Sequence, residues 1–127
     1  MVDIREQSPL TLAFVGDAVY SLMIREYLAD KRYNINKLHH LTVCYVSAHG
    51  QMQALGIIEN MLTEEEKNII KRGHNSSKAS VAKHATVEEY RSSTGFECLM
   101  GYLELTGQKD RLKEIVDYII ANFKIEE

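Results

Sequence analysis

Two acidic residues lie inside apolar stretches of the sequence, where a carboxylate can do chemistry. Asp17 is the single acid in LAFVGDAVYSLM, and Glu97 lies in TGFECLMGYLEL. An ionised carboxylate loses several kcal/mol when it leaves water without a partner. Each acid therefore needs a basic side chain, a helix end, a shared proton or a bound cation from elsewhere in the fold.

A helix through Asp17 offers this carboxylate no partner of its own. At about 100° per residue, Asp17 faces the same way as four apolar residues: Leu10, Ala13, Ile24 and Leu28. A helix that is apolar nearly all round is normally buried, so we expect the same of this one. Two interpretations stay open from the spacing. Asp17 is either paired with an arginine or a helix end in the core, or it binds a metal or takes part in catalysis.

Glycines accompany both acids. Gly16 precedes Asp17, and Gly95 and Gly101 flank Glu97. A glycine inside a helix costs about 1 kcal/mol and usually lets another backbone come close. We therefore expect two glycine-bearing helices to bring Asp17 and Glu97 together. Adjacent carboxylates repel unless they share a proton or a cation, and one or two carboxylates with waters are the usual ligands of Mg²⁺.

The helices that position these acids follow from cap signals and apolar spacing. Ser8-Pro9 is a helix start, and Thr63-x-x-Glu66 and Thr86-x-x-Glu89 are capping boxes. No run alternates with the period of two that is typical of a strand. The pattern predicts an all-α bundle of five or more helices, over about residues 9–30, 36–55, 63–73, 86–107 and 108–123.

Composition narrows the class of protein. The chain has 127 residues, 45% hydrophobic and 26% charged, which suits one globular domain spanning residues 1–127. No signal peptide or membrane span is expected, and Cys44 and Cys98 lack metal-ligand spacing. We predict two buried thiols and a cytoplasmic protein. The net charge of −3 argues only weakly against nucleic acid, because the distribution of charge matters more.

Two motifs carry a resemblance to a known family. FVGDAVYSL, residues 14–22, resembles the signature helix of the ribonuclease III family, whose core reads F-L-G-D-[AS]-V-L. FECLMGYLEL, residues 96–105, resembles the second acidic helix of that family. Three longer segments extend the resemblance to the short bacterial Mini-ribonuclease III branch, which has no double-stranded-RNA-binding domain: LHHLTVCYVSAHGQ, KRGHNSSKASVAKHA and YRSSTGFECLMGYLELTG.

The resemblance implies a Mg²⁺-dependent endoribonuclease that cleaves double-stranded RNA. It further implies maturation of the large-subunit (23S) ribosomal RNA precursor by a homodimer with one Mg²⁺ site per subunit. Asp17 takes the place of the family's central aspartate, and Glu97 that of the glutamate that closes the site. Both are therefore implied as catalytic residues and metal ligands. A ribosomal protein that presents the RNA is a candidate further partner.

A basic segment supplies the expected RNA contacts. From Lys67 to Thr86 the chain holds five basic residues and no acid, with serines and histidines between them. Such a segment suits phosphate and 2′-OH contacts on an A-form duplex, although a solvated loop can be basic without binding anything. The residues that we predict to bind RNA are Lys71, Arg72, His74, Asn75, Lys78, Lys83, His84 and Arg91.

The chain also departs from the family pattern. Leu10 and Ala13 stand where full-length members carry glutamates, and Thr94 stands where they carry an aspartate. The number of Mg²⁺ ions is therefore open, and Thr94 either orients a water or packs its helix. Two other functions remain as alternatives. One is a catalytically silent RNA- or ribosome-binding module, and the other is an unrelated helical regulatory domain with Asp17 salt-bridged in its core.

Overall fold

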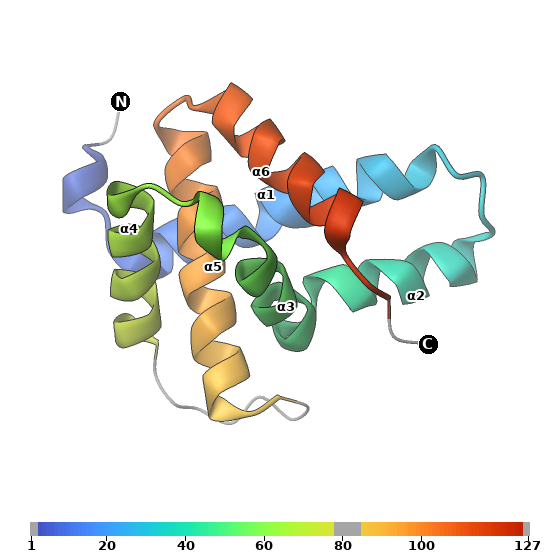
Figure 1. Ribbon diagram of the computed structural model, residues 1–127, viewed down its shortest axis with the longest axis horizontal. Helices are drawn as coiled ribbons and strands as arrows, with labels where there is room; N and C mark the ends of the chain where they lie inside the picture. Colours follow the sequence, from blue (N-terminus) through green and yellow to red (C-terminus); the bar gives the residue numbers. More distant parts are fainter. Residues whose placement is uncertain (1–2, 78–84, 126–127) are drawn as a thin grey trace.

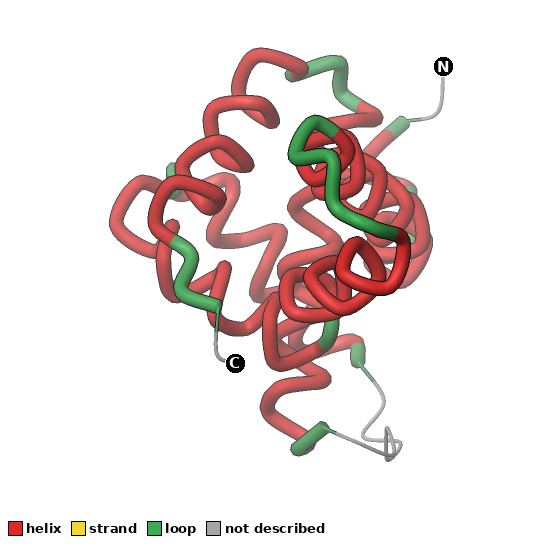
Figure 2. Tube along the Cα trace, turned by 90° about the vertical axis from the view of Figure 1, so that its right-hand side faces the viewer, coloured by secondary structure: helices red, strands yellow, loops and turns green. Residues whose placement is uncertain are grey.

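The computed structural model describes residues 3–77 and 85–125, and nearly all of this part is helical. Six α-helices are joined by short loops, and no strand occurs among the described residues (Figure 2). The prediction of an all-α fold is confirmed. The helices are α1 (Pro9–Ala29), α2 (Ile35–Val46), α3 (Ala48–Ile58), α4 (Glu64–Ser76), α5 (Val87–Leu105) and α6 (Lys109–Asn122), with 3₁₀ turns η1 (Ile4–Glu6) and η2 (Glu59–Met61).

Helix α5 is the central element of the bundle. It runs through the middle of the molecule, with α4 on one side and α3 on the other (Figure 1). Its residues from Ser92 to Leu103 are buried with the exception of Glu97, which is half-buried. Phe96 packs edge-to-face on Tyr20 of α1, with ring centroids 4.8 Å apart. The second acidic residue therefore sits on the most enclosed helix of the fold.

Helices α1 and α5 cross at two glycines. A Cβ on Gly16 would overlap the carbonyl oxygen of Glu97, and a Cβ on Gly101 would overlap the carbonyl oxygen of Leu12. Only glycine allows two helix backbones to approach this closely. The crossing places Asp17, the residue after Gly16, beside Glu97, as the glycine pattern predicts.

The helix expected over residues 36–55 is two helices. Ser47 has extended backbone angles, and its Oγ accepts a hydrogen bond from the N–H of Gly50 at 3.1 Å, so this serine ends α2 and caps α3. Gly50 lies against the carbonyl oxygens of Cys44 and Tyr45, where a larger residue would collide. The prediction of one continuous helix was wrong because a serine N-cap occurs inside an apolar pattern that continues across it.

Helix α4 runs to Ser76, three residues beyond the predicted end at Gly73. Gly73 does not end the helix, because it packs against Gly95 and Cys98 of α5, in a contact that has no room for a Cβ. Gly107, in contrast, has a φ of 72° and follows the end of α5, as predicted. Both capping boxes are present, with the hydrogen bonds expected of Thr63 and Thr86.

The face of α1 that carries Leu10 is not buried. Leu10 is 45% exposed, Phe14 is 80% exposed and Leu22 is 58% exposed. The buried residues of this helix are Leu12, Ala13, Gly16, Tyr20, Ile24 and Leu28. The expected burial of α1 nearly all round was therefore wrong, and Asp17 is an exposed residue. None of the helices described here is long and apolar enough to cross a membrane.

Candidate active site

The centre of the candidate site is a contact between two carboxyl groups. Glu97 is half-buried on α5, and its side chain hydrogen-bonds to Asp17 on α1. Burial, this hydrogen bond and the charge of Asp17 together raise the pKa of Glu97 from 4.5 to about 8. Two carboxylates in contact cannot both ionise without cost, and a shared proton or a bound cation would remove that cost.

Gln51 of α3 is a third member of this site that the sequence did not point out. Its side chain is 1% exposed, and its Nε2 donates to Oε2 of Glu97 at 3.3 Å and to the carbonyl oxygen of Val46 at 3.1 Å. A signal was present, because Gln51 falls three residues after Ala48 on the apolar stripe predicted for residues 36–55. It is a polar residue on an apolar stripe, the same anomaly that distinguishes Asp17.

The oxygen atoms at this site suit a divalent cation that has one or two protein ligands and several waters. They do not suit a metal ion that is fully enclosed by protein ligands. Among the residues that the structure describes, no three His, Cys, Asp or Glu side chains gather into a metal-binding cluster. The carboxylates of Asp17 and Glu97 would each supply oxygen ligands to such a cation, and Asp17 is exposed. Mg²⁺ is typically held in this way, by one or two carboxylates with waters at the remaining positions.

The alternative partners for Asp17 are not observed. No ion pair of Asp17 occurs within residues 3–77 and 85–125, and the neighbouring Arg25 donates from Nε to Oγ of Ser21 at 3.1 Å. Among the described residues, the buried acid with an arginine partner is Glu66 of α4, which accepts two hydrogen bonds from Arg111 of α6. The structure therefore does not support a core salt bridge at Asp17.

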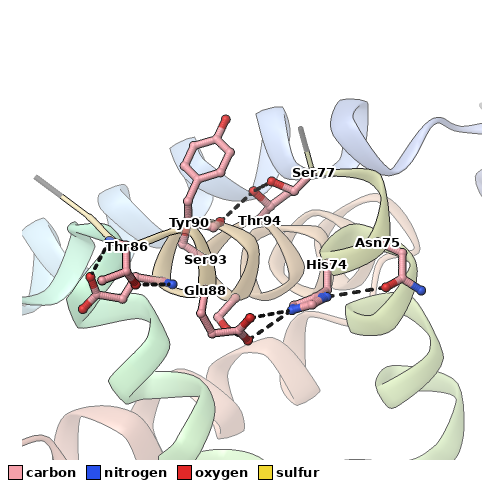
Figure 3. A network of polar contacts seen from close by, with 10 residues as sticks. His74, Asn75, Ser77, Thr86, Glu88, Tyr90, Ser93 and Thr94 are labelled. Atoms are coloured by element: carbon pink, nitrogen blue, oxygen red, sulfur yellow. Dashed lines mark hydrogen bonds and ion pairs between the residues drawn. The ribbon is translucent and has the colours of Figure 1, made fainter. Parts of the chain in front are cut away.

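Two of the three positions where full-length family members carry acids hold buried residues. Thr94 is buried, and its Oγ1 donates to the carbonyl oxygen of Tyr90 at 3.0 Å and to Oγ of Ser77 at 3.3 Å (Figure 3). These bonds join α5 to the end of α4 and leave the Thr94 hydroxyl without a role at the carboxyl pair. Ala13 is buried, and Leu10 is largely exposed.

Helix α4 displays part of the predicted RNA-binding set beside the carboxyl pair. Lys71, Arg72 and Asn75 are exposed, and the helix crosses α5 at Cys98, the residue next to Glu97. Lys71, together with Lys67 and His74, also lines an open cleft of about 710 Å³ between α3 and α4. Lys78, Lys83 and His84 lie outside the described residues.

Two of the predicted RNA-binding residues are not fully free at the surface. His74 is half-buried, and its Nε2 lies 3.1 Å from Oε1 of Glu88, which also accepts from Ser92 (Figure 3). This contact ties the last part of α4 to the first turn of α5. Arg91 is half-buried, and its Nε makes no hydrogen bond with any residue in the described part of the chain.

The family is shown by comparison with known proteins. The ribonuclease III domain family matches residues 10–108, which include both acidic residues. The chain therefore belongs to the ribonuclease III family, and it is an endoribonuclease. The resemblance to the Mini-ribonuclease III branch, noted from the sequence motifs, is confirmed by the relatives that match.

Three of these relatives illustrate the similarity. The Mini-ribonuclease 3 of Thermoanaerobacter sp. is 49% identical over 111 residues, which cover 87% of this chain and 78% of the relative. That of Enterococcus faecalis is 47% identical over 124 residues, covering 94% and 93%. That of Clostridium tetani is 41% identical over 120 residues, covering 93% and 80%.

The fold is matched by a solved structure as well. A crystal structure of a protein from Fusobacterium nucleatum superposes with a TM-score of 0.85 at 36% sequence identity, covering 95% of this chain and 98% of that one.

Proposed function

We propose that this endoribonuclease is Mg²⁺-dependent, that it cleaves double-stranded RNA, and that Asp17 and Glu97 are its catalytic metal ligands. The observation that carries the proposal is the α1–α5 crossing, where Gly16 lies against the backbone carbonyl of Glu97 and the Asp17 side chain contacts that of Glu97. A structural acid has no need of a second acid beside it, because the pair destabilises both charged forms. A bound cation removes that penalty.

The chain's own residues have distinct tasks in hydrolysis. Mg²⁺, when bound, lowers the pKa of a water and stabilises charge on the phosphate oxygens. Asp17 presents its carboxylate from the exposed side of α1, where a duplex can approach. Glu97 closes the site from the half-buried side, and Gln51 fixes its carboxylate by a hydrogen bond. Gly16 sets the distance between the two helices.

The RNA duplex is bound by the basic surface of α4 and the segment that follows it. Lys71, Arg72 and Asn75 are available for phosphate and 2′-OH contacts, and Arg91 offers a guanidinium from the start of α5. Lys78, Lys83 and His84 belong to the same proposed surface by their place in the sequence. His74 contributes through Glu88, because that contact holds the last part of α4 against the first turn of α5.

The active form is a homodimer that meets the RNA with two such sites. Leu10, Phe14 and Leu22 recur at four- and eight-residue spacing on the exposed face of α1, the helix that also carries Asp17. Large apolar side chains gathered on one exposed helix face mark an interaction surface. A second copy of the chain is the proposed occupant. The proposed substrate is the 23S ribosomal RNA precursor in the cytoplasm, with a ribosomal protein as a candidate partner on that RNA.

The experiment that tests the function is cleavage of a long RNA duplex by the wild type and by Asp17→Asn, with Mg²⁺ and with EDTA. We expect cutting by the wild type only, and only with Mg²⁺. Because Asp17 is exposed, the variant should keep its fold, with a change in stability of less than about 1 kcal/mol. A loss of about 3–5 kcal/mol would indicate a buried ion pair instead. A wild type that binds the duplex without cutting it would favour the silent module.

A further inference from the structure

Gln51 has a side-chain orientation that its surroundings determine. Its amide lies between two acceptors, the carbonyl oxygen of Val46 at 3.1 Å and Oε2 of Glu97 at 3.3 Å. The NH₂ group must face both of them, because the flipped amide would set oxygen against oxygen. The amide oxygen, Oε1, is bonded to the same carbon as this NH₂ group, whose nitrogen lies 3.3 Å from Oε2 of Glu97.

This oxygen is buried without a hydrogen-bond donor. Oε1 of Gln51 has no partner among the residues that the structure describes, and the whole side chain is 1% exposed. An unsatisfied buried acceptor costs about 1–3 kcal/mol, and such a group in a folded protein calls for a water or an ion as its partner. A methionine of similar length would fill the same space without that cost. The amide is therefore a poor choice for packing alone.

The surrounding site lacks oxygen donors. Within the part of the chain that the structure describes, Asp17 and Glu97 are the acids at this site, and Leu10, Ala13 and Thr94 stand where acids occur in full-length family members. Cations of the Mg²⁺ and Mn²⁺ type prefer carboxylate, carbonyl and water oxygens. The amide oxygen of Gln51 is a carbonyl-type donor on a side chain that already contacts Glu97.

We propose that Gln51 completes the cation site: its Nε2 holds the Glu97 carboxylate in position, and its Oε1 is a third oxygen donor toward the divalent cation or a water bound to it. The inference rests on the proposed function, because it assumes that a cation binds at Asp17 and Glu97. It adds a positioning residue from a third helix, α3, to acids from α1 and α5.

Two substitutions separate the two ends of the amide. Gln51→Met keeps the length of the side chain and removes both donor and acceptor, whereas Gln51→Glu keeps oxygen donors and removes the NH₂ group. Gln53→Met is the matched control, because Gln53 lies on the same helix but donates to the carbonyl oxygen of Lys124 at 2.9 Å, away from the site. Circular dichroism and thermal melting establish that each variant is folded.

The first measurement is Mn²⁺ binding to the RNA-free protein. The electron paramagnetic resonance signal of the unbound Mn²⁺ reports how much has bound. Loss of a group that orients a metal ligand typically costs about 10- to 100-fold in metal affinity, and we expect this for Gln51→Met. Gln51→Glu should bind Mn²⁺ at least as tightly as the wild type, and the Gln53 control should match it. The Mg²⁺ concentration for half-maximal cleavage should rise for Gln51→Met, with KM for the duplex unchanged.

The melting temperature with and without Mg²⁺ distinguishes a role in the cation site from a structural one. If Gln51 serves the cation, Mg²⁺ should raise the melting temperature of the wild type more than that of Gln51→Met. An equal rise in both, with equal Mn²⁺ affinity, would overturn the inference. If Gln51→Met and Gln51→Glu lost Mn²⁺ affinity equally, the role of Oε1 would be overturned. A wild type that neither binds Mn²⁺ nor cuts a duplex would overturn the proposed function itself, and with it this inference.

Discussion

At the scale of single residues, Glu97 differs from the other perturbed carboxyl groups in the direction of its pKa. Hydrogen bonds lower the pKa values of Glu66, Glu88 and Glu89, so these three acids favour the charged form in the folded chain. Burial, with the hydrogen bond to Asp17 and its charge, instead raises the pKa of Glu97 to about 8. Among these four acids, Glu97 is therefore the one whose raised pKa suits the exchange of a proton for a bound cation.

This raised pKa predicts how stability depends on pH in EDTA. Between the ordinary pKa of 4.5 and about 8, the folded state binds more protons at Glu97 than the unfolded state does. The free energy of unfolding must then fall as pH rises through this window, and this contribution levels off above it. We expect the melting temperature of the wild type to fall from pH 5 to pH 8.5 by more than that of Glu97→Gln. If the melting temperatures of the two proteins changed with pH in the same way, the raised pKa of Glu97 would be contradicted.

The same melting experiment, repeated with Mg²⁺, provides a second test. At pH 8.5, above the raised pKa of about 8, a charged Glu97 lies beside Asp17, so a cation should restore stability to the wild type. Glu97→Gln, which keeps one of the two carboxylates, should respond less.

The sequence allowed the carboxyl pair to be predicted but not its surroundings. Asp17 and Glu97 stood out because each is an acid among apolar residues next to a glycine. Gln51 did not, because an uncharged amide in a polar-looking segment carries no obvious cost until its burial is known. The expected burial of Asp17 was wrong because a helical pattern shows which residues are apolar, and not which of them a single copy covers.

At the scale of elements, side-chain chemistry predicted the helix starts better than the breaks. Thr63 and Thr86 each cap a helix through local hydrogen bonds with the residue three positions on, and local bonds can be recognised in a sequence. The break at Ser47 depends on a close contact between α2 and α3 at Gly50, which is a tertiary feature. Gly73 was taken for a helix end because its partner on α5 is distant in sequence.

The crossing of α1 and α5 gives a prediction at this scale. Gly16→Ala places a Cβ against the carbonyl oxygen of Glu97 and the amide of Gly101, so the helices must separate. Overpacking of this kind typically costs about 1–3 kcal/mol, and the shift also moves Asp17 away from Glu97. We expect a lower melting temperature and, in the fraction that remains folded, weaker Mn²⁺ binding.

Gly56→Ala is the matched control for that substitution. Gly56 is an exposed helical residue of α3 with no atom within 4 Å of an added Cβ. Alanine there should be neutral or stabilising by up to about 1 kcal/mol, because it is the better helix former. Should both alanines prove equally harmless, the close approach of α1 and α5 would not be what holds the two acids together.

At the scale of the whole molecule, the average properties of the chain conceal how its surface is divided. The net charge is −3, yet the exposed residues of α4 that face solvent beside the site include Lys71 and Arg72. The apolar residues of α1 are split between the core and a second, uncovered face. The run of basic residues in the sequence predicted the basic surface of α4. The uncovered face of α1 could not be predicted, since a surface that awaits a partner has the same composition as a core.

That uncovered face leads to the last prediction, which concerns assembly. Phe14 is 80% exposed, and burying a phenylalanine side chain is worth about 1.5–3 kcal/mol, so Phe14 should be central to contact with a second copy. Light scattering should give the wild type about twice the chain mass of 14.5 kDa, and Phe14→Glu that mass once. Tyr118→Glu, at a 47% exposed aromatic residue of α6, is the control and should remain dimeric.

The monomeric variant also allows cation binding and duplex cleavage to be tested separately. Because Asp17, Glu97 and Gln51 all belong to one subunit, Phe14→Glu should bind Mn²⁺ like the wild type. Its cleavage of a duplex should nevertheless be lost, since one small domain presents a single site and half of the basic surface. A monomer that cuts duplex RNA at the wild-type rate would show that each subunit is sufficient, and that Phe14 is exposed for another reason.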